Sequence, residues 1–251
     1  TPPGRVLIES GELLAGYRQA VRVLRAARAM FVDIELSPEQ IPEGTLWNSY
    51  YGSRIAWADD ALGIRCGREW SGSDVEGERI ESPEWVEVND GFGTITCYGL
   101  GLAYHRQVGA NLLDTLLCVA GETTRRFQFA LAIDDRLPAK SALGLLTAGR
   151  TFVAELPELP ESSSGWLLYV GAKNVLVTHV EQLATPAAGI RVRLLETAGV
   201  PTQTILEAFR PVRSAHRTDF RSQPSGVLSV TEGRVRVDLE ANEWMQLEVE
   251  W

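Results

Sequence analysis

The amino-acid sequence predicts an all-β protein with two sandwich-like parts, a larger one over residues 1–158 and a smaller one over residues 159–251. Three observations support this fold class: two patterns typical of β-hairpins, a series of short runs rich in β-branched and aromatic residues, and a stretch rich in Pro and Ser between the two parts. That stretch, residues 156–165, reads LPELPESSSG, a composition typical of an exposed connection.

The beginning of the larger part fits two patterns. In residues 12–30, Tyr17, Val21 and Leu24 share one face at helical spacing, so local pattern alone favours an amphipathic helix. The same Tyr and Val positions also alternate with Arg residues, as they would on a strand. The apolar run at residues 30–36 that follows is a clearer strand, and a Ser-Pro pair ends it.

The first hairpin pattern also lies in the larger part. Residues 85–88 and 93–98 are both rich in β-prone residues. Asp90-Gly91 lies between them, and this pair favours a tight turn between antiparallel strands. The two runs therefore predict a pair of adjacent strands.

The second hairpin pattern lies in the smaller part. Residues 227–230 lead through Glu232-Gly233 into residues 235–239, where Val and Leu alternate with charged residues. A period of two buries one face of a strand and leaves the other in water. Further strands are predicted at residues 127–133, 166–170, 175–180, 190–195 and 246–250.

Composition and charge disfavour several classes of function. Lys and Arg total 24 against 33 Asp and Glu, and the formal net charge of −9 disfavours a nucleic-acid partner. No stretch approaches the roughly 18–20 apolar residues of a membrane span. The cysteines, Cys66, Cys97 and Cys118, are odd in number and far apart, which favours a reducing, cytoplasmic location over a disulfide framework. No initiator Met precedes Thr1, so we expect the chain to be part of a longer protein.

An aromatic segment at residues 47–57 is the first candidate for a ligand site. On a strand, Tyr50 and Arg54 project to one face, while Tyr51 and Trp57 project to the other and are predicted core residues. Aromatic faces stack on the apolar surface of sugars, and planar charged groups bond to paired hydroxyls. The alternative interpretation, in which these aromatic side chains pack in the core or between domains, stays open.

A second polar and aromatic cluster lies at residues 104–106, and Glu81 precedes the first hairpin. His105 could act as an acid or base near neutral pH, or it could be a hydrogen-bonded histidine at a strand end. A Glu and a His on one concave face would suit the proton transfer of an aldose epimerase. The predicted ligand-binding residues are Tyr50, Arg54, Glu81, Tyr104, His105 and Arg106.

The chain also carries a family resemblance. Six tracts occur in an order and at a spacing that resemble the C-terminal β-region of bacterial α-mannosidase-like glycoside hydrolases of family 38, and they extend over most of the chain. The tracts are NSYYGSRIAW (48–57), ERIESP (78–83), LAYHR (102–106), LLDTLL (112–117), VRLLETAG (192–199) and FRP (209–211).

The resemblance implies both a fold and a location for the chemistry. In that family, an α/β catalytic domain and a helical domain precede large β-sandwich regions related to the mutarotase-like supersandwich. The resemblance therefore implies a supersandwich followed by a smaller sandwich, with strands over residues 12–30. Family members hydrolyse α-mannosides with a zinc ion held in the α/β domain. None of the three histidines here begins the family's His-x-Asp zinc pair, so the resemblance assigns no catalytic residue or metal ligand to this chain.

We therefore expect a non-catalytic C-terminal fragment of an α-mannosidase-like hydrolase, with no cofactor of its own and with zinc in the parent enzyme. Its partner would be the missing N-terminal catalytic domain, which it would support while contacting sugar and helping to assemble a homo-oligomer. Two alternatives stay open. One is a stand-alone carbohydrate-binding module that uses Tyr50, Arg54 and residues 104–106, and the other is a mutarotase-like aldose epimerase that uses Glu81 and His105.

Overall fold

The computed structural model describes residues 4–7, 13–23, 29–58, 63–147, 165–184 and 188–251. The chain divides into two compact units, Thr1–Thr147 and Ala148–Trp251, and each is described by itself. The predicted connection at residues 156–165 lies outside the described residues except for Gly165, and so does the predicted boundary after residue 158. Both therefore stay predictions.

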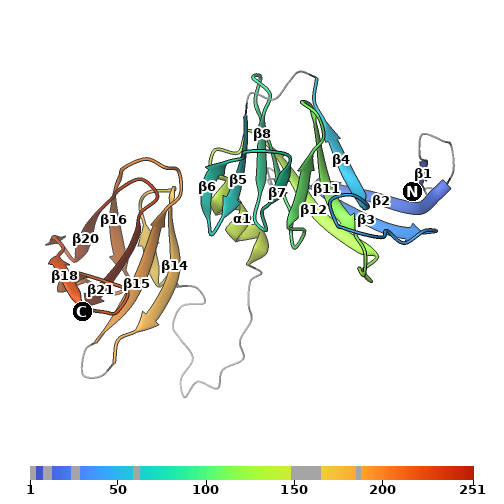
Figure 1. Ribbon diagram of the computed structural model, residues 1–251. Helices are drawn as coiled ribbons and strands as arrows, with labels where there is room; N and C mark the ends of the chain where they lie inside the picture. Colours follow the sequence, from blue (N-terminus) through green and yellow to red (C-terminus); the bar gives the residue numbers. More distant parts are fainter. Residues whose placement is uncertain (1–3, 8–12, 24–28, 59–62, 148–164, 185–187) are drawn as a thin grey trace, which may run out of the picture. The chain divides into compact units, whose positions relative to one another are not determined.

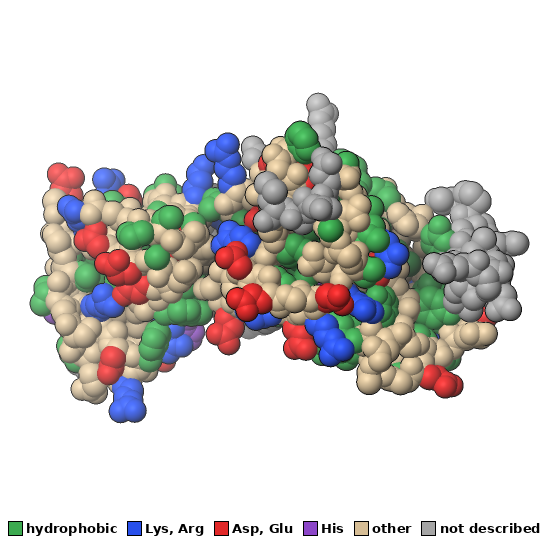
Figure 2. Space-filling model, turned by 45° about the horizontal axis from the view of Figure 1, so that its top comes forward, with side chains coloured by type: hydrophobic (Ala, Val, Ile, Leu, Met, Phe, Trp, Pro, Cys, Tyr) green, Lys and Arg blue, Asp and Glu red, His purple; other side chains and the backbone are tan. Residues whose placement is uncertain are grey.

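The predicted all-β fold class is confirmed, because antiparallel strands make up most of the described chain (Figure 1). The one helix among the described residues, α1 (Pro138–Leu146), has neither the length nor the apolar character that a membrane crossing requires. Acidic and basic side chains are interspersed over the face drawn in Figure 2, so the formal charge of −9 is not gathered into a single patch on this face.

The first unit contains an eight-stranded and a four-stranded sheet. The large sheet has the order β1-β2-β3-β12-β9-β8-β5-β6, and the small sheet has the order β4-β11-β10-β7. In chain order the strands are β1 (Gly4–Leu7), β2 (Leu13–Val23), β3 (Ala29–Pro38), β4 (Tyr51–Ala56), β5 (Gly63–Arg68), β6 (Ser71–Asp74), β7 (Arg79–Glu81), β8 (Val86–Asn89), β9 (Thr94–Tyr98), β10 (Tyr104–Gln107), β11 (Leu112–Cys118) and β12 (Arg126–Ile133).

The core of the first unit lies between its two sheets. Val32 and Phe129 of the large sheet pack in one buried cluster with Leu117 of the small sheet. On the opposite face of the large sheet, α1 buries Ala142 in a cluster with Trp85. The large sheet therefore has buried residues on both faces, and the outer face of the small sheet is left to carry polar side chains.

The described part of residues 12–30 forms strands, as the family resemblance implied: residues 13–23 form β2 and residues 29–30 begin β3. Residues 12 and 24–28 lie outside the described residues. β2 pairs with β3 in antiparallel register, with Arg18 opposite Glu35 and Arg22 opposite Asp33. The Arg22 Nε atom lies 2.8 Å from Asp33 Oδ2, and the Arg18 Nη1 atom lies 4.0 Å from Glu35 Oε2. Arg18 and Arg22, which follow Tyr17 and Val21 in the alternating pattern, therefore meet acidic partners across the sheet, and this tertiary pairing overrides the local helical pattern.

The second unit is a sandwich of a four-stranded sheet, β13-β16-β20-β19, and a five-stranded sheet, β14-β15-β21-β17-β18, in which β14 and β18 are the edges. Val192, Leu206, Val237 and Leu247 are among the fully buried residues of the core between them. The strands are β13 (Leu168–Val170), β14 (Val175–Gln182), β15 (Gly189–Glu196), β16 (Thr202–Ala208), β17 (Ser214–Thr218), β18 (Pro224–Val227), β19 (Val230–Thr231), β20 (Arg234–Leu239) and β21 (Trp244–Glu250).

Both predicted hairpins are present, with one correction. β8 pairs with β9 around the Asp-Gly turn, and β19 pairs with β20. Glu232 and Gly233 connect β19 and β20 with φ angles of 52° and 76°, as the tight turns of two-residue hairpins require. The predicted strand at residues 227–230 is wrong as a single element, because Val227 ends β18, which pairs with β17 in the other sheet.

A buried carboxylate organises one end of the second sandwich. Glu196, at the end of β15, is fully buried. It accepts hydrogen bonds from the Asn174 side chain (2.8 Å) and from the backbone N–H groups of Ala198 (2.7 Å), Gly199 (2.8 Å) and Asn242 (3.0 Å). Burial acts to raise the pKa of Glu196, but these hydrogen bonds outweigh it and hold the pKa below its usual range. The ionised Glu196 carboxylate thus holds two connections in place, the one that follows β15 and the one between β20 and β21.

We predict that Glu196→Gln lowers the free energy of unfolding of the second unit by about 2 kcal/mol at neutral pH, because an amide cannot accept all of these hydrogen bonds. Since the folded-state pKa of Glu196 is lowered, the unmodified chain should lose this stabilisation as the pH falls through that pKa. The unfolding free energy of Glu196→Gln should not show this dependence on pH. Urea unfolding at neutral pH and at acidic pH measures both effects.

The matched control is Glu181→Gln. Glu181 is half-exposed, lies in the same sandwich and pairs with Arg191 at 2.8 Å, so its loss should change the unfolding free energy by about 0.5 kcal/mol or less. Equal losses in the two variants would contradict the role given to Glu196.

A candidate ligand site on the outer face of the small sheet

The register of the small sheet of the first unit brings four charged residues into one row. Arg54 on β4 lies opposite Asp114 on β11, Asp114 lies opposite Arg106 on β10, and Arg106 lies opposite Arg79 on β7. Side chains at directly opposite positions leave an antiparallel sheet on the same face. Segments separated by as many as 60 residues therefore contribute to a single polar surface.

Asp114 is the centre of this row. Its carboxylate is buried and accepts hydrogen bonds from the Tyr50 hydroxyl (2.8 Å), from Arg54 Nε (2.6 Å) and from Arg54 Nη2 (2.8 Å). Burial, together with the hydrogen bond to Asp114, raises the pKa of Tyr50, and the hydrogen bond to Asp114 raises the pKa of Arg54. The two-point contact between guanidinium and carboxylate is a strong, oriented interaction, so it fixes the position of both groups.

A hollow of about 570 Å³ opens over this centre. Gly52 contributes no side chain to it, and a Cβ atom there would lie 3.2 Å from the Tyr50 ring. Arg106 borders the hollow and is itself held in place, because its Nη1 atom donates to the Trp47 carbonyl oxygen (2.9 Å) and its Nη2 atom lies 3.5 Å from Glu78. The lining residues are Asn48, Ser49, Tyr50, Gly52, Arg54, Arg106 and Asp114.

Two other predicted residues line a second hollow, of about 590 Å³. Tyr104 and Glu81 are directly opposite each other on β10 and β7. The Trp47 ring lies edge-on to Tyr104 at 5.8 Å between centroids, and the Arg79 guanidinium lies 5.7 Å from the Trp47 centroid. The lining residues are Arg68, Glu69, Arg79, Glu81, Ser82, Pro83, Ala103 and Tyr104.

His105 does not join the other five predicted residues. Its side chain is fully buried on the inner face of the small sheet, where Nδ1 lies 3.0 Å from the Thr115 hydroxyl. Burial lowers the pKa of His105 to about 4, although the backbone of Ser82 and Leu102 partly counters this effect. The ring is therefore neutral near pH 7, and the interpretation as a hydrogen-bonded strand histidine describes its environment.

The structure also separates the pair on which the epimerase hypothesis depends. Glu81 is exposed on the outer face of the small sheet, whereas His105 is buried on the inner face. The register explains the separation, because the residue opposite His105 is the buried Ile80, and Glu81 lies opposite Tyr104. The epimerase alternative requires Glu81 and His105 on one concave face, and the two side chains do not lie on the same face of the sheet.

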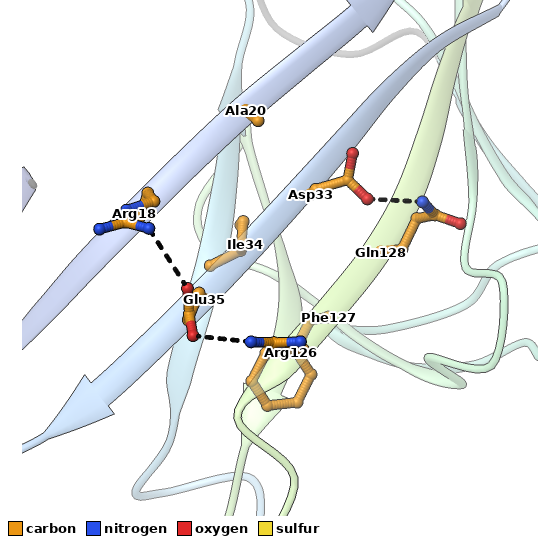
Figure 3. A pocket seen from close by; sticks show the side chains of 8 residues that line it. All are labelled: Arg18, Ala20, Asp33, Ile34, Glu35, Arg126, Phe127 and Gln128. Atoms are coloured by element: carbon orange, nitrogen blue, oxygen red, sulfur yellow. Dashed lines mark hydrogen bonds and ion pairs between the residues drawn. The ribbon is translucent and has the colours of Figure 1, made fainter. Parts of the chain in front are cut away.

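A third hollow, of about 310 Å³, lies on the large sheet over β2, β3 and β12 (Figure 3). Its charged side chains neutralise one another: Glu35 lies between Arg18 (4.0 Å) and Arg126 (3.4 Å), and Asp33 accepts a hydrogen bond from Gln128 (2.5 Å). These partners are largely exposed, so water screens their charges. This surface is best described as a cross-strand network of ion pairs.

Sequence reasoning found Tyr50, Arg54 and Arg106 but missed Asp114, which organises them. Asp114 lies in the run LLDTLL, whose other members are apolar or Thr. A single acid in such a run is a usable signal, because a buried charge requires a partner. The signal cannot name that partner, since Tyr50 and Arg54 are 64 and 60 residues away.

The fold and this surface together define a two-sandwich protein with a polar, concave face on its first sandwich. No family model matches the sequence, and no curated protein matches it. The structure is similar to a protein in glycosyl hydrolase family 38 from Enterococcus faecalis, with a TM-score of 0.70, 12% identity, and coverage of 94% of this chain and 30% of that chain.

A second similar structure is an alpha-mannosidase from Enterococcus faecalis V583, with a TM-score of 0.71 and 11% identity. The match covers 95% of this chain and 29% of that chain, so the present chain spans under a third of the length of either protein. At this identity the comparisons establish the fold. They confirm, at the level of fold, the resemblance to part of a family 38 glycoside hydrolase.

We predict that Asp114→Asn lowers the free energy of unfolding of the first unit by about 2 kcal/mol, because a neutral amide cannot satisfy Arg54 and Tyr50 together. Tyr50→Phe, which removes one of the three hydrogen bonds, should cost about 1 kcal/mol. Asp33→Asn serves as the control, since Asp33 is partly exposed and should contribute about 0.5 kcal/mol or less. Urea unfolding of the three variants would disprove the central role of Asp114 if Asp33→Asn were the most damaging.

Proposed function

We propose that this chain is the C-terminal β-sandwich region of a larger α-mannosidase-like glycoside hydrolase, in which it supports the catalytic domain and does not itself cleave the substrate. The observation that carries this proposal is the match in fold, which covers 94% of this chain but 30% of a family 38 protein. In the same proposal, the parent enzyme cleaves a mannoside and its catalytic domain is the partner of this chain. Several copies of the parent protein assemble with one another.

The side chains that line the hollow around Asp114 agree with a supporting role for this chain. Hydrolysis with retention at a sugar needs two carboxyl groups about 5–5.5 Å apart, one of them a proton donor. Among the described residues, Asp114 is the one carboxyl group that lines this hollow, and Arg54 and Tyr50 bond to its oxygens.

The zinc ion that the resemblance implies for the parent enzyme does not fit the residues described here. Among them, no group of three His, Cys, Asp or Glu side chains could hold a metal ion. We therefore place zinc, in this proposal, in the part of the parent enzyme that is not in this chain, and assign it no step here.

We predict that the chain alone, supplied with zinc, releases no product from an aryl α-mannoside above the buffer rate, because one carboxyl group among the described residues lines the hollow around Asp114, whereas hydrolysis needs two. The protein expressed from the whole reading frame around this segment should hydrolyse the same substrate. Sequencing that frame should show an upstream α/β segment with a His-x-Asp pair. Turnover by the chain alone, or a start codon immediately before Thr1, would overturn the proposal.

A second candidate function is sugar binding by the hollow itself, either within the parent or as a stand-alone module. The arrangement of Tyr50, Asp114 and Arg54 favours it, because oriented polar groups border an open hollow beside the aromatic pair of Trp47 and Tyr104. Hydroxyls of a sugar could bond to the guanidinium and phenol groups, while an aromatic ring covers an apolar sugar face.

For this second candidate, calorimetry with mannobiose should show millimolar binding that disappears in Arg54→Ala. Arg54→Lys keeps the charge opposite Asp114 but loses the planar fork, so it should weaken binding at least tenfold while better preserving the fold. Arg126→Ala, which removes a largely exposed arginine on the large sheet, should bind normally. Absence of any heat of binding rejects the sugar site and leaves the proposal of a supporting region intact.

A further inference from the structure

The inner face of the large sheet in the first unit is not covered over its whole width. The exposed fractions of Val21 and Val23, on β2, are 49% and 72%. The register places Val21 opposite Val32 and Val23 opposite Met30, and Val32 is a buried member of the cluster between the two sheets. Side chains at opposite positions leave a sheet on the same face. The face that forms the core therefore continues along β2 into solvent.

The two sheets extend to different distances from a contact that they share. The Cys97 sulfur on β9 lies 3.7 Å from the Thr115 hydroxyl oxygen on β11. From Cys97, the row of opposite residues in the large sheet crosses β12 and β3 and reaches Val23, three strands away. From Thr115, the row in the small sheet ends at Ser53, one strand away, because β4 is an edge. At about 4.8 Å per strand, roughly 10 Å of the large sheet extends past the small one.

The free edge of β4 is suited to pairing with another strand. Trp57, which follows β4, donates its N–H to the Asn111 carbonyl oxygen on the β11 side (3.2 Å). Because the N–H groups of an antiparallel strand alternate between its two sides, those of Arg54 and Ala56 point to the free side. The ladder between β4 and β11 is regular from Gly52 to Ala56, and β4 contains neither Pro nor Lys. Three devices that commonly block strand addition, a bulge, Pro and Lys, are therefore absent from this described stretch.

The place where the chain enters the first unit selects what covers this surface. β1 is the strand beyond β2 in the large sheet, so the chain enters on the side where the small sheet is short (Figure 1). Gly4, at the start of β1, lies opposite Tyr17, and Leu7, at its end, lies opposite Leu13. The start of β1 is thus its end nearer to Val21. The match to the family 38 protein covers 30% of that chain, so most of such a chain lies outside it. A segment that precedes β1 in the parent would arrive beside the uncovered valines and the free edge.

We propose that a strand of the parent polypeptide, preceding this sequence, pairs with the free edge of β4 and covers Val21 and Val23. Its inward residues would be apolar, to bury the two valines, and its outward residues polar, as strand alternation requires at the surface of a sandwich. Such a strand would satisfy the edge amides and the exposed valines together. The inference rests on the proposed function, because it needs a longer parent chain, and it names the surface at which that chain continues the sandwich.

Hydrogen exchange tests the pairing directly. In the chain of residues 1–251, the amides of Arg54 and Ala56 should exchange as those of an open strand edge do. In the protein expressed from the whole reading frame, they should exchange at least tenfold more slowly, because the added strand accepts hydrogen bonds from them.

Val23→Asp and its matched control, Val227→Asp, test the burial of the valines. Val227 is 81% exposed and lies in the second unit. In the chain of residues 1–251, both variants should unfold at the temperature of the unmodified chain, because both side chains lie in water. In the whole protein, Val23→Asp should lower the unfolding temperature and restore fast exchange at Arg54 and Ala56, and Val227→Asp should do neither.

The possible outcomes separate this inference from the proposed function. If the whole protein hydrolyses an aryl α-mannoside but the β4 amides exchange fast, the inference fails and the proposed function stands. A reading frame without an upstream segment would remove both. Slow exchange in the chain of residues 1–251 that appears only at high concentration, together with a dimer in sedimentation, would assign the edge to a second copy and reject the inference. Slow exchange in the whole protein that Val23→Asp leaves unchanged would also reject it.

Discussion

In an antiparallel sheet, successive side chains leave opposite faces, and this constraint decides which residues of the protein meet solvent. Residues 104–106 show it most directly. Tyr104 and Arg106 project outward to the two hollows, whereas His105 between them is buried beside Thr115. The same rule separates the core residue Leu206 from its exposed neighbours in the second unit. The candidate ligand site of the first unit is therefore on the outer face of a sheet whose inner face forms a core.

Two buried carboxylates, Glu196 and Asp114, differ in the groups that donate hydrogen bonds to them, and this difference determines what each can do. Glu196 is satisfied mainly by backbone N–H groups, so its position follows from the path of the chain and it serves to hold connections. Asp114 is satisfied by the side chains of Arg54 and Tyr50, which line an open hollow. A ligand could rearrange the second set of partners without unfolding a connection, and this difference makes Asp114 the better centre for recognition.

Much of the fold could be predicted from local sequence, because turns and alternation are short-range signals. The Glu232-Gly233 turn and the alternating β20 strand illustrate this. Residues 12–30 could not be assigned from pattern alone, since the choice of strand depends on acids in β3, across the sheet. The outward residues of the candidate site, such as Tyr50 and Arg54, could be predicted from the sequence. Asp114, at its centre, could not, because only the long-range register places it beside Arg54. His105 illustrates the same limit, since nothing local indicates which face of β10 is inward.

The two edges of the five-stranded sheet have a consequence for behaviour at high concentration. An exposed strand edge offers unpaired N–H and C=O groups to any other chain, and a long, regular edge invites cross-chain pairing. One edge, β18, begins with Pro224, which has no N–H to donate. The other edge, β14, carries a bulge between Val177 and His179 that interrupts its ladder. Both edges are therefore poor templates for strand addition, which protects this sandwich from growing into an intermolecular sheet.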